Sequence, residues 1–179
     1  MSLENVKRVD LFIETAVILV RDRPHTEWRF HVIGDGSLRL ELEQKSVDLR
    51  LTDRIRFHGH REDAATSVAG LDVLVICSDY EGMPMVALEA AALEVSTVAH
   101  AVGGLIDVVP AKLQVERHDA LGYSAAILRA LTPDGRADCR RQAKLIHKTY
   151  SARRNAELMR DLYERVITEQ NGRRRSVRS

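Results

Sequence analysis

Residues 71–90, LDVLVICSDYEGMPMVALEA, decide the fold class of this chain. The run from Leu71 to Ile76 is short and apolar, as is typical of a central parallel strand buried on both faces. Pro84 then suits the first position of a helix, which needs no backbone N–H donor, and we expect this helix to reach about Leu93. A buried strand that leads into a helix predicts an α/β fold, with residues 78–83 at the carboxyl edge of the sheet, where such folds bind ligands.

Strands and helices alternate along the rest of the chain. Apolar residues at helical spacing predict a first helix from about Lys7 to Asp22, ended by Pro24. Further strands are expected at Trp28–Ile33, Ile55–His58 and Thr97–Ala101, and further helices at about Ser37–Leu51, Glu62–Ala69, Ala120–Leu131, Asp134–Lys148 and Ala152–Glu169. We therefore expect a Rossmann-like, doubly wound parallel sheet with helices on both faces over residues 1–170, followed by a basic, disordered tail over residues 171–179.

A sheet of this kind normally opens with a strand, whereas this sequence begins almost directly on a helix. Two explanations are open. Either the first strand has been removed, or the sheet is one strand short.

Composition narrows the class of protein. Of 179 residues, 45% are hydrophobic and only 4% aromatic, so the core must be mostly aliphatic. The 27 basic and 26 acidic side chains give a net charge of +1, which argues against a nucleic-acid binder. The exception is the tail, where Arg173, Arg174, Arg175 and Arg178 could hold a phosphate surface, although a solvated tail is the favoured interpretation.

Cysteine use and hydropathy indicate the compartment. Cys77 and Cys139 lie far apart and form neither a disulfide framework nor a metal-binding spacing, and Cys77 is interpreted as a small buried hydrophobe. No signal peptide precedes the first helix, and no apolar stretch approaches the ~20 residues of a membrane span. We expect a cytoplasmic protein, with peripheral membrane contact left open.

The loop and helix over residues 78–90 carry the chemistry. Gly82 permits close backbone approach, and the N–H groups at the helix start are free where the helix dipole favours negative charge. This combination suits a phosphate or a sugar oxygen. Glu81 precedes the helix and Glu89 lies roughly 8–12 Å further along it, at ~1.5 Å per residue. Two carboxylates at that separation could accept hydroxyl groups at both ends of a nucleotide sugar.

The pattern E-G-x-P-x-x-x-x-E-A over residues 81–90 resembles the signature of the retaining GT-B glycosyltransferases of family 4. Further matches extend over nearly the whole chain, at Lys7–Leu11, Val32–Gly36, Phe57–Gly59, Leu71–Val73, Gly103–Gly104, Tyr150–Ser151 and Tyr163. The resemblance implies the C-terminal, donor-binding half of a GT-B fold. Its substrate would be a UDP-, GDP- or ADP-linked sugar, transferred with retention at the anomeric carbon and without a cofactor or bound metal.

The resemblance also implies roles for single residues. Glu81 would be the catalytic residue that faces the donor sugar, and Glu89 would hold the ribose hydroxyls. Lys7 matches the lysine that neutralises the pyrophosphate. The remaining donor-binding positions are the backbone of Gly82, Met83 and Pro84, the cleft glycines Gly34 and Gly36, and His58 and Arg61 around the base.

Simpler interpretations exist for each feature. Glu81 could be a charge near a helix start, Glu89 part of a surface ion pair, and Lys7 an exposed lysine, although a lysine near a helix start is unfavourable without an anion. Gly34-Asp35-Gly36 could serve any strand-to-helix turn, and Met83 and Met85 could simply pack. His58 and His60 alternate around Gly59 like a metal pair, but no third ligand is evident, so no metal site is predicted.

The sequence also departs from the family pattern. The N-terminal acceptor-binding domain and the upstream glycine-arginine segment are absent, and the loop after Val109 is short. Glu94 and Ser96 stand where the family places glycine and proline, so Glu94 should require a different turn. We therefore expect no sugar transfer by this chain alone. The alternative function is a non-catalytic, degenerate nucleotide-binding or protein-interaction module.

The last helix carries Leu158, Leu162, Tyr163 and Val166 on one apolar face. In complete enzymes of this family the C-terminal helix crosses back to the N-terminal domain. Here that face is expected to meet an N-terminal acceptor domain. Without one it must fold onto this domain or bind a partner, as in a homodimer.

Overall fold

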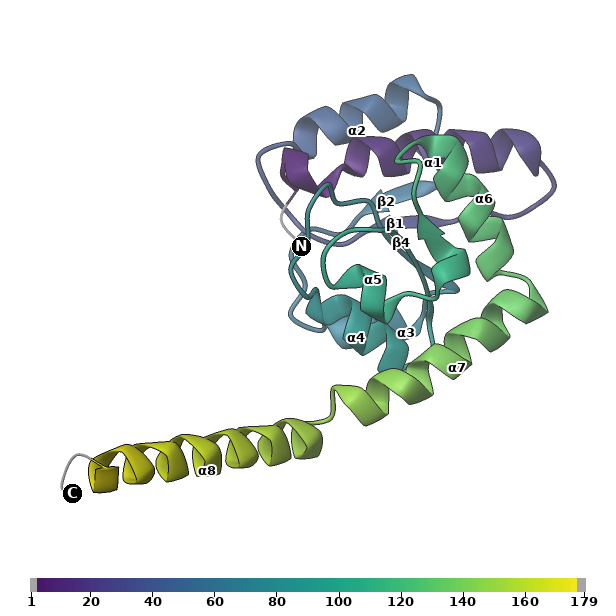
Figure 1. Ribbon diagram of the computed structural model, residues 1–179. Helices are drawn as coiled ribbons and strands as arrows, with labels where there is room; N and C mark the ends of the chain where they lie inside the picture. The colour runs from purple at the N-terminus through teal and green to yellow at the C-terminus, as the bar shows by residue number, and fades with distance from the viewer. Residues whose placement is uncertain (1–2, 177–179) are drawn as a thin grey trace. The chain divides into compact units, whose positions relative to one another are not determined.

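The strands of this protein form parallel sheets between two layers of helices, as the computed structural model in Figure 1 shows. The structure describes residues 3–176, except for the side chains of residues 64–65 and 169–176. The chain divides into two units, residues 1–143 and residues 144–179. The first unit contains every strand that the structure describes and confirms the predicted α/β fold with a doubly wound, parallel arrangement.

The elements of the first unit are η1 (Asn5–Lys7), α1 (Val9–Asp22), β1 (Phe30–Val32), α2 (Arg39–Asp48), β2 (Ile55–Phe57), α3 (Ala64–Ala69), β3 (Val73–Ile76), α4 (Met85–Ala92), β4 (Ser96–His100), α5 (Leu105–Val108), η2 (Ala111–Leu113), β5 (Gln114–Val115), α6 (Ala120–Ala130) and the first part of α7 (Pro133–Thr149). Helices and strands alternate from α1 to β4, and two helical elements in a row occur at η1–α1, α5–η2 and α6–α7. In Figure 1, α1, α2 and α6 lie on one side of the strands and α3, α4 and α5 on the other.

The sheet is in two pieces. β1 pairs only with β2, from Phe30 opposite Ile55 to Val32 opposite Phe57. β4 lies between β3 and β5 in a separate three-stranded sheet. Among residues 3–176, no strand pairs with the second edge of β1 or of β3. This agrees with the expectation that the sheet lacks one strand.

The prediction that β3 is buried on both faces was wrong. Val73, Leu74 and Val75 are only partly buried, and within β3 only Ile76 is buried, at 8% exposure. The reason is the unpaired edge, because a central strand is covered by neighbours on both sides. The central strand of this sheet is instead β4, whose Ser96–Ala99 are all buried.

Two helix starts differ from the prediction. Arg8 adopts a left-handed backbone with φ 48°, which separates η1 from α1, so Lys7 ends a short 3-10 turn and does not begin α1. Pro84 has an extended backbone with φ −72° and ψ 117°, so it caps α4, and Met85 is the first helical residue. The elements α5, η2 and β5 were not predicted, because each is too short to show a periodic pattern.

The turn after α4 does not change as Glu94 had suggested. Glu94 itself adopts the left-handed conformation with φ 55°. Its N–H donates to the Ala91 carbonyl at 3.1 Å, and the Val95 N–H donates to the Ala90 carbonyl at 2.8 Å. These two bonds form the Schellman ending that normally uses glycine, so Glu94 accepts the strain that glycine would avoid.

The core of the first unit lies on both sides of β4. Its largest fully buried side chains include Tyr123, Ile13, Leu105 and Leu113. Cys77 and Cys139 are both free and buried, and burial raises the pKa of the Cys77 thiol. Cys77 is therefore a small core residue, as predicted, and its thiol stays protonated near neutral pH.

The second unit consists of the end of α7 and of α8 (Ala152–Ser176). Along α8, Leu158, Leu162, Tyr163 and Val166 are all exposed, by 43% to 59%. The helix continues through residues 171–176, where we expected a disordered tail; Arg178 lies outside the described residues. An acceptor domain or a homodimer on the apolar face remains a prediction.

None of the helices that the structure describes is long and apolar enough to cross a membrane.

Candidate functional site

Lys7 and Glu81 meet at the carboxyl end of β3. The Lys7 Nζ lies 2.7 Å from Glu81 Oε1, although the two residues are 74 positions apart. The Ser78 hydroxyl donates to the same oxygen at 2.6 Å. The structure thus brings together the residue that the resemblance assigns to the pyrophosphate, Lys7, and the one that it assigns to the donor sugar, Glu81. Both side chains are partly exposed, by 24% and 13%, so a ligand can reach them.

Backbone contacts hold each partner in place. The Asp79 N–H donates to the Val6 carbonyl at 2.9 Å, which ties the loop after β3 to the segment that carries Lys7. On the other side, the Gly104 N–H donates to the Gly82 carbonyl at 2.6 Å. A Cβ on Gly103 would overlap the Glu81 carbonyl oxygen, and Gly103 has φ 51°. Glycine is therefore required here so that the chain after β4 can support the Glu81 loop.

The start of α4 presents unpaired backbone donors beside this pair. The first intrahelical donors of any helix lack partners, and here they belong to Met85 and Val86, because the Ala87 N–H already bonds to the Pro84 carbonyl at 3.0 Å. Gly82 is exposed and a Cβ on it would meet open space, so a ligand can approach this residue closely, although its carbonyl is already bonded by Gly104. The positive end of the helix dipole adds to the charge of Lys7. This edge of the sheet therefore favours an anion.

Glu89 lies within α4 and is partly buried. Within residues 3–176, with the side-chain exceptions given above, its carboxylate has no hydrogen bond or ion pair. A surface ion pair, the simpler interpretation of Glu89, is thus not formed. Its oxygens remain able to accept hydroxyl groups.

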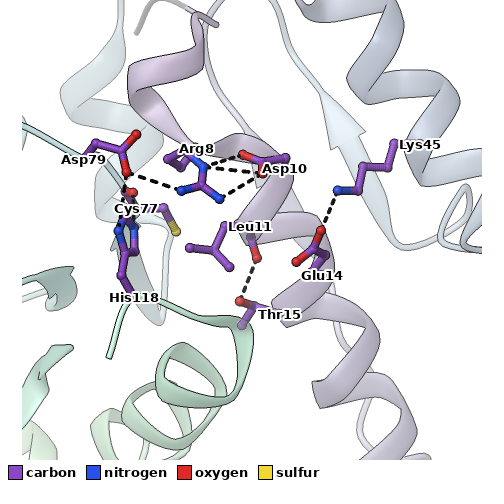
Figure 2. A network of polar contacts seen from close by, with 9 residues as sticks. All are labelled: Arg8, Asp10, Leu11, Glu14, Thr15, Lys45, Cys77, Asp79 and His118. Carbon is purple, nitrogen blue, oxygen red and sulfur yellow. Dashed lines mark hydrogen bonds and ion pairs between the residues drawn. The ribbon is translucent and has the colours of Figure 1, made fainter. Parts of the chain in front are cut away.

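A second charged cluster lies next to Lys7 and was not predicted (Figure 2). The Arg8 guanidinium donates to Asp10 Oδ1 at 3.1 Å and to Asp79 Oδ1 at 3.3 Å. Burial acts to raise the pKa of Asp10, but the hydrogen bonds and charge of Arg8 outweigh it and hold that pKa below its ordinary value. One guanidinium between two carboxylates leaves an excess of negative charge. Arg8 is therefore committed to the protein, and Lys7 remains the better partner for an anion.

Two stacked histidines complete this edge. The rings of His100 and His118 stack with centroids 3.8 Å apart. His118 Nε2 lies 2.8 Å from the Cys77 carbonyl and must carry a proton there, since a carbonyl only accepts. His118 Nδ1 lies 3.4 Å from Asp79 Oδ1. Burial and the neighbouring His118 lower the pKa of His100, although its contact with the Ser78 carbonyl acts in the opposite direction.

The predicted residues around β1 and β2 form a separate group. The Gly34 N–H donates to the Gly59 carbonyl at 2.8 Å, and a Cβ on Gly36 would lie 2.6 Å from the Leu3 backbone nitrogen. Gly36 is thus required by the close approach of Leu3. Arg61 is paired with Asp63, with Nε 2.8 Å from its Oδ1.

His58 does not pair with His60 as a metal site would require. Its Nε2 lies 2.9 Å from Nδ1 of His31, on the neighbouring strand. Burial, followed by the charges of His31 and Arg61, lowers the pKa of His58. Among the described residues, no group of three His, Cys, Asp or Glu side chains is arranged to hold a metal ion.

A hollow of about 440 Å³ lies beside the second cluster and does not include Lys7, Glu81 or Glu89. Arg8 and Lys45 are its basic lining residues, and its acidic ones are Glu4, Asp10, Glu41 and Asp79. This acidic excess would repel a diphosphate. The hollow is therefore a poor candidate for the nucleotide, despite its size.

Sequence reasoning missed Arg8, Asp79, His100 and His118. One signal could have found three of them, because side chains that follow parallel strands converge at one edge. Asp79 follows β3, His100 ends β4 and His118 follows β5. Since the two-residue β5 was not predicted, His118 could not be placed.

Comparison with known proteins finds a family of glycosyltransferases. Residues 1–133 match the family described as glycosyl transferases group 1. The D-inositol 3-phosphate glycosyltransferase of Saccharomonospora viridis is 30% identical over 183 residues, a match that covers 95% of this chain and 42% of that protein. The chain spans 14% to 42% of the length of this and two further curated relatives.

Solved structures share the fold at low sequence identity. HepE of Anabaena, in complex with UDP and glucose, superposes with a TM-score of 0.79 at 17% identity, over 92% of this chain and 47% of that chain. The C-terminal domain of a glycosyl transferase group 1 family protein, LpcC of Francisella tularensis, gives a TM-score of 0.69 at 23% identity, over 83% of this chain and 81% of that one. At these identities the likeness establishes the fold alone, the GT-B arrangement.

Proposed function

Because this chain belongs to the glycosyl transferases group 1, we propose that it is the donor-binding half of a sugar-transferring enzyme and holds a nucleoside diphosphate sugar at the Lys7–Glu81 site. The observation that carries this proposal is the ion pair itself, at the carboxyl edge of the sheet beside an open helix start. In doubly wound folds, nucleotides bind at this edge.

The diphosphate would lie against Lys7 and the first turn of α4. An ammonium group has three donors, and Lys7 uses one of them on Glu81, so two remain for phosphate oxygens. The free N–H groups of Met85 and Val86 add neutral donors aimed along the helix dipole. When the sugar departs, negative charge grows on the diphosphate, and these fixed groups would stabilise it without reorganising.

The sugar and the ribose would lie at opposite ends of this anion site. Both hydrogen bonds to Glu81 use Oε1, so in the described residues Oε2 remains able to accept a hydroxyl of the donor sugar. Glu89 lies five residues after the Pro84 cap, about 7.5 Å along the helix axis, where its carboxylate would accept the ribose hydroxyls. The base would then lie towards His58 and Arg61. Retention at the anomeric carbon and the acceptor are predictions for a complete enzyme.

Nucleotide binding can be tested directly by thermal shift and calorimetry with UDP, GDP and ADP. A ligand at 100 times its dissociation constant stabilises the fold by about 2.7 kcal/mol, which is readily measured. We expect one nucleotide to bind. Lys7→Met and Glu89→Gln should each lower the affinity for that nucleotide about tenfold, because each removes a charged hydrogen bond worth about 1.4 kcal/mol.

A matched control is Lys112→Met. Lys112 is an exposed lysine before β5, and its Nζ lies 3.5 Å from Asp138 Oδ2. Its replacement should leave nucleotide affinity unchanged. Absence of binding by all three nucleotides, or equal losses in Lys7→Met and Lys112→Met, would contradict the proposed site. Binding without sugar transfer would fit a donor half that needs an acceptor domain.

A further inference from the structure

Two histidines hold the backbone that follows β3. His118 Nε2 lies 2.8 Å from the Cys77 carbonyl oxygen. His100 Nδ1 lies 3.2 Å from the carbonyl oxygen of the next residue, Ser78. Cys77 and Ser78 are both buried, and they lie beyond Ile76, the last residue that β3 pairs with β4. A buried carbonyl without a donor destabilises the fold, so the two rings supply bonds that the sheet does not.

These contacts determine which ring nitrogen carries a proton. A carbonyl oxygen only accepts, so His118 must donate from Nε2 and His100 from Nδ1. Burial lowers the pKa of His100, although its bond to the Ser78 carbonyl acts in the opposite direction. The neutral form of this ring therefore carries its one proton on Nδ1. Two neighbouring histidines that donate from different nitrogens are a signature of hydrogen bonding, since packing alone would not select these nitrogens.

Ring contacts fix the orientation of both donors. The His100 and His118 rings stack with their centroids 3.8 Å apart and their planes inclined by 25°. The His118 ring also lies against Tyr123, with centroids 5.8 Å apart, and Tyr123 is fully buried in α6. A side chain whose rotamer is locked by packing holds its partner precisely. The two rings therefore form a rigid support at the carboxyl edge of the sheet.

The supported backbone places the two charged residues of the donor site. The Ser78 hydroxyl donates to Glu81 Oε1 at 2.6 Å, and Lys7 Nζ lies 2.7 Å from the same oxygen. The Asp79 N–H donates to the Val6 carbonyl at 2.9 Å, which ties this backbone to the residue before Lys7. A shift of the backbone at Ser78 would therefore move Glu81 and release Lys7.

The Asp79 side chain joins the histidines to Arg8, the residue after Lys7 (Figure 2). Asp79 Oδ1 lies 3.4 Å from His118 Nδ1 and 3.3 Å from Arg8 Nη1. His118 thus contacts the backbone before Asp79 through one ring nitrogen and the Asp79 carboxylate through the other. Loss of this ring would loosen both contacts.

We propose that His100 and His118 are positioning residues of the donor site. Their ring N–H groups hold the segment Cys77–Glu81, and this segment keeps Glu81 and Lys7 together where the sugar and the diphosphate would lie. A site held in place before the ligand arrives loses less freedom on binding, so the two rings should raise nucleotide affinity without touching the nucleotide. The inference rests on the proposed function, because it concerns the same donor site.

The test compares variants that keep each donor with variants that lose it. His118→Gln places an amide N–H near the position of Nε2, and His100→Asn places one near that of Nδ1. His118→Leu and His100→Leu remove the donor and keep an apolar side chain. The matched control is His25→Leu, because His25 is an exposed histidine in the turn before β1. Hydrogen exchange at the Asp79 amide and affinity for UDP, GDP and ADP are measured for every variant and for the unmutated protein.

The first result concerns the unmutated protein without ligand. Nitrogen NMR spectra of the histidine rings near neutral pH should show a proton on Nε2 of His118 and on Nδ1 of His100. A ring without a proton on its assigned nitrogen would overturn the proposal, because that nitrogen could not donate to the carbonyl.

We expect each leucine variant to speed exchange at Asp79 and to lower nucleotide affinity, both by about tenfold, whereas the glutamine and asparagine variants should stay within about threefold of the unmutated protein. His25→Leu should change neither. Equal effects of the leucine and amide variants would overturn the proposal, because the rings would then only pack. Unchanged affinity in the leucine variants would also overturn it. If none of the three nucleotides binds the unmutated protein, the proposed function fails, while the ring spectra and the exchange at Asp79 still decide whether the histidines hold the segment.

Discussion

β3 and β4 are neighbours in one sheet, yet they are buried to different degrees. Val75 and Val98 are the same residue at paired positions of the two strands, but Val98 is fully buried and Val75 only partly. β4 reads STVAH and is almost entirely buried, whereas β3 reads VLVI and is not. The difference teaches that the neighbours of a strand, more than its apolar content, decide how deeply its side chains are buried.

The largest expected effect is the contrast between Val98→Asp and Val75→Asp. At Val98 an unpaired carboxylate would be fully buried, at a cost of several kcal/mol against a typical total stability of about 5–15 kcal/mol. At Val75 the carboxylate can reach solvent along the free edge. We expect insoluble or unfolded protein from Val98→Asp and folded, less stable protein from Val75→Asp, measured by soluble yield and circular dichroism. Similar behaviour of the two variants would break the comparison.

Hydrogen exchange should separate the same two strands in the unmutated protein. β4 pairs with β3 from Ser96 to Ala99 and with β5 at Ala99 and His100, and Ser96–Ala99 are all buried, so its amides should open only with most of the structure. Alternate amides of β3 face the free edge and should exchange at least about 100-fold faster. The control is the other half of the β3 amides, which bond to β4 and should be slow. Uniform protection along β3 would mean that its outer edge is covered in solution.

A smaller effect is expected from Glu94→Gly, in the turn that leads into β4. Glu94 has φ 55°, a conformation that costs a non-glycine residue about 1–2 kcal/mol. Glycine removes this strain, but its greater freedom in the unfolded chain offsets part of the gain. We expect a net gain of about 0.5–1 kcal/mol in the free energy of unfolding, measured in urea. Glu94→Ala, which keeps the left-handed strain, is the control and should show no such gain.

The smallest effect is a pH dependence at His100, the last residue of β4. Its pKa lies below the ordinary value for histidine in the folded protein, mainly because of burial. The unfolded chain therefore binds a proton more readily, and the stability that His100 contributes is present above its unfolded pKa and is lost as pH falls below it. Between about pH 7.5 and about pH 5.5, the urea midpoint of His100→Gln should fall less steeply than that of the unmutated protein. Part of the pH dependence should remain in this variant, because the pKa of His58 is also lowered. The same pH dependence of the urea midpoint in both proteins would show that His100 does not contribute to it.

The sequence predicted the fold class, because the patterns of its strands and helices are local and strong. The shared site of Lys7 and Glu81 was implied only by the family resemblance, since the two residues are 74 positions apart. It predicted β3 as a central strand from its apolar run, and this failed because burial depends on a neighbour that the run does not encode. Asp79, Arg8 and His118 were missed for a related reason. Their contact exists only once β3, β5 and the first helix are placed in space, and β5 is too short to be recognised.

The N-terminal segment has a consequence for the order of folding. Leu3 contacts Asp35, but Lys7 contacts Glu81, 74 positions later in the chain. The entropy lost on closing a loop grows with the logarithm of its length, so such a contact is rewarded only after the intervening elements have condensed. Lys7 thus finds its partner only after the elements between the two residues have formed. A partly folded chain would carry no assembled Lys7–Glu81 pair, and formation of that pair would mark the completed first unit.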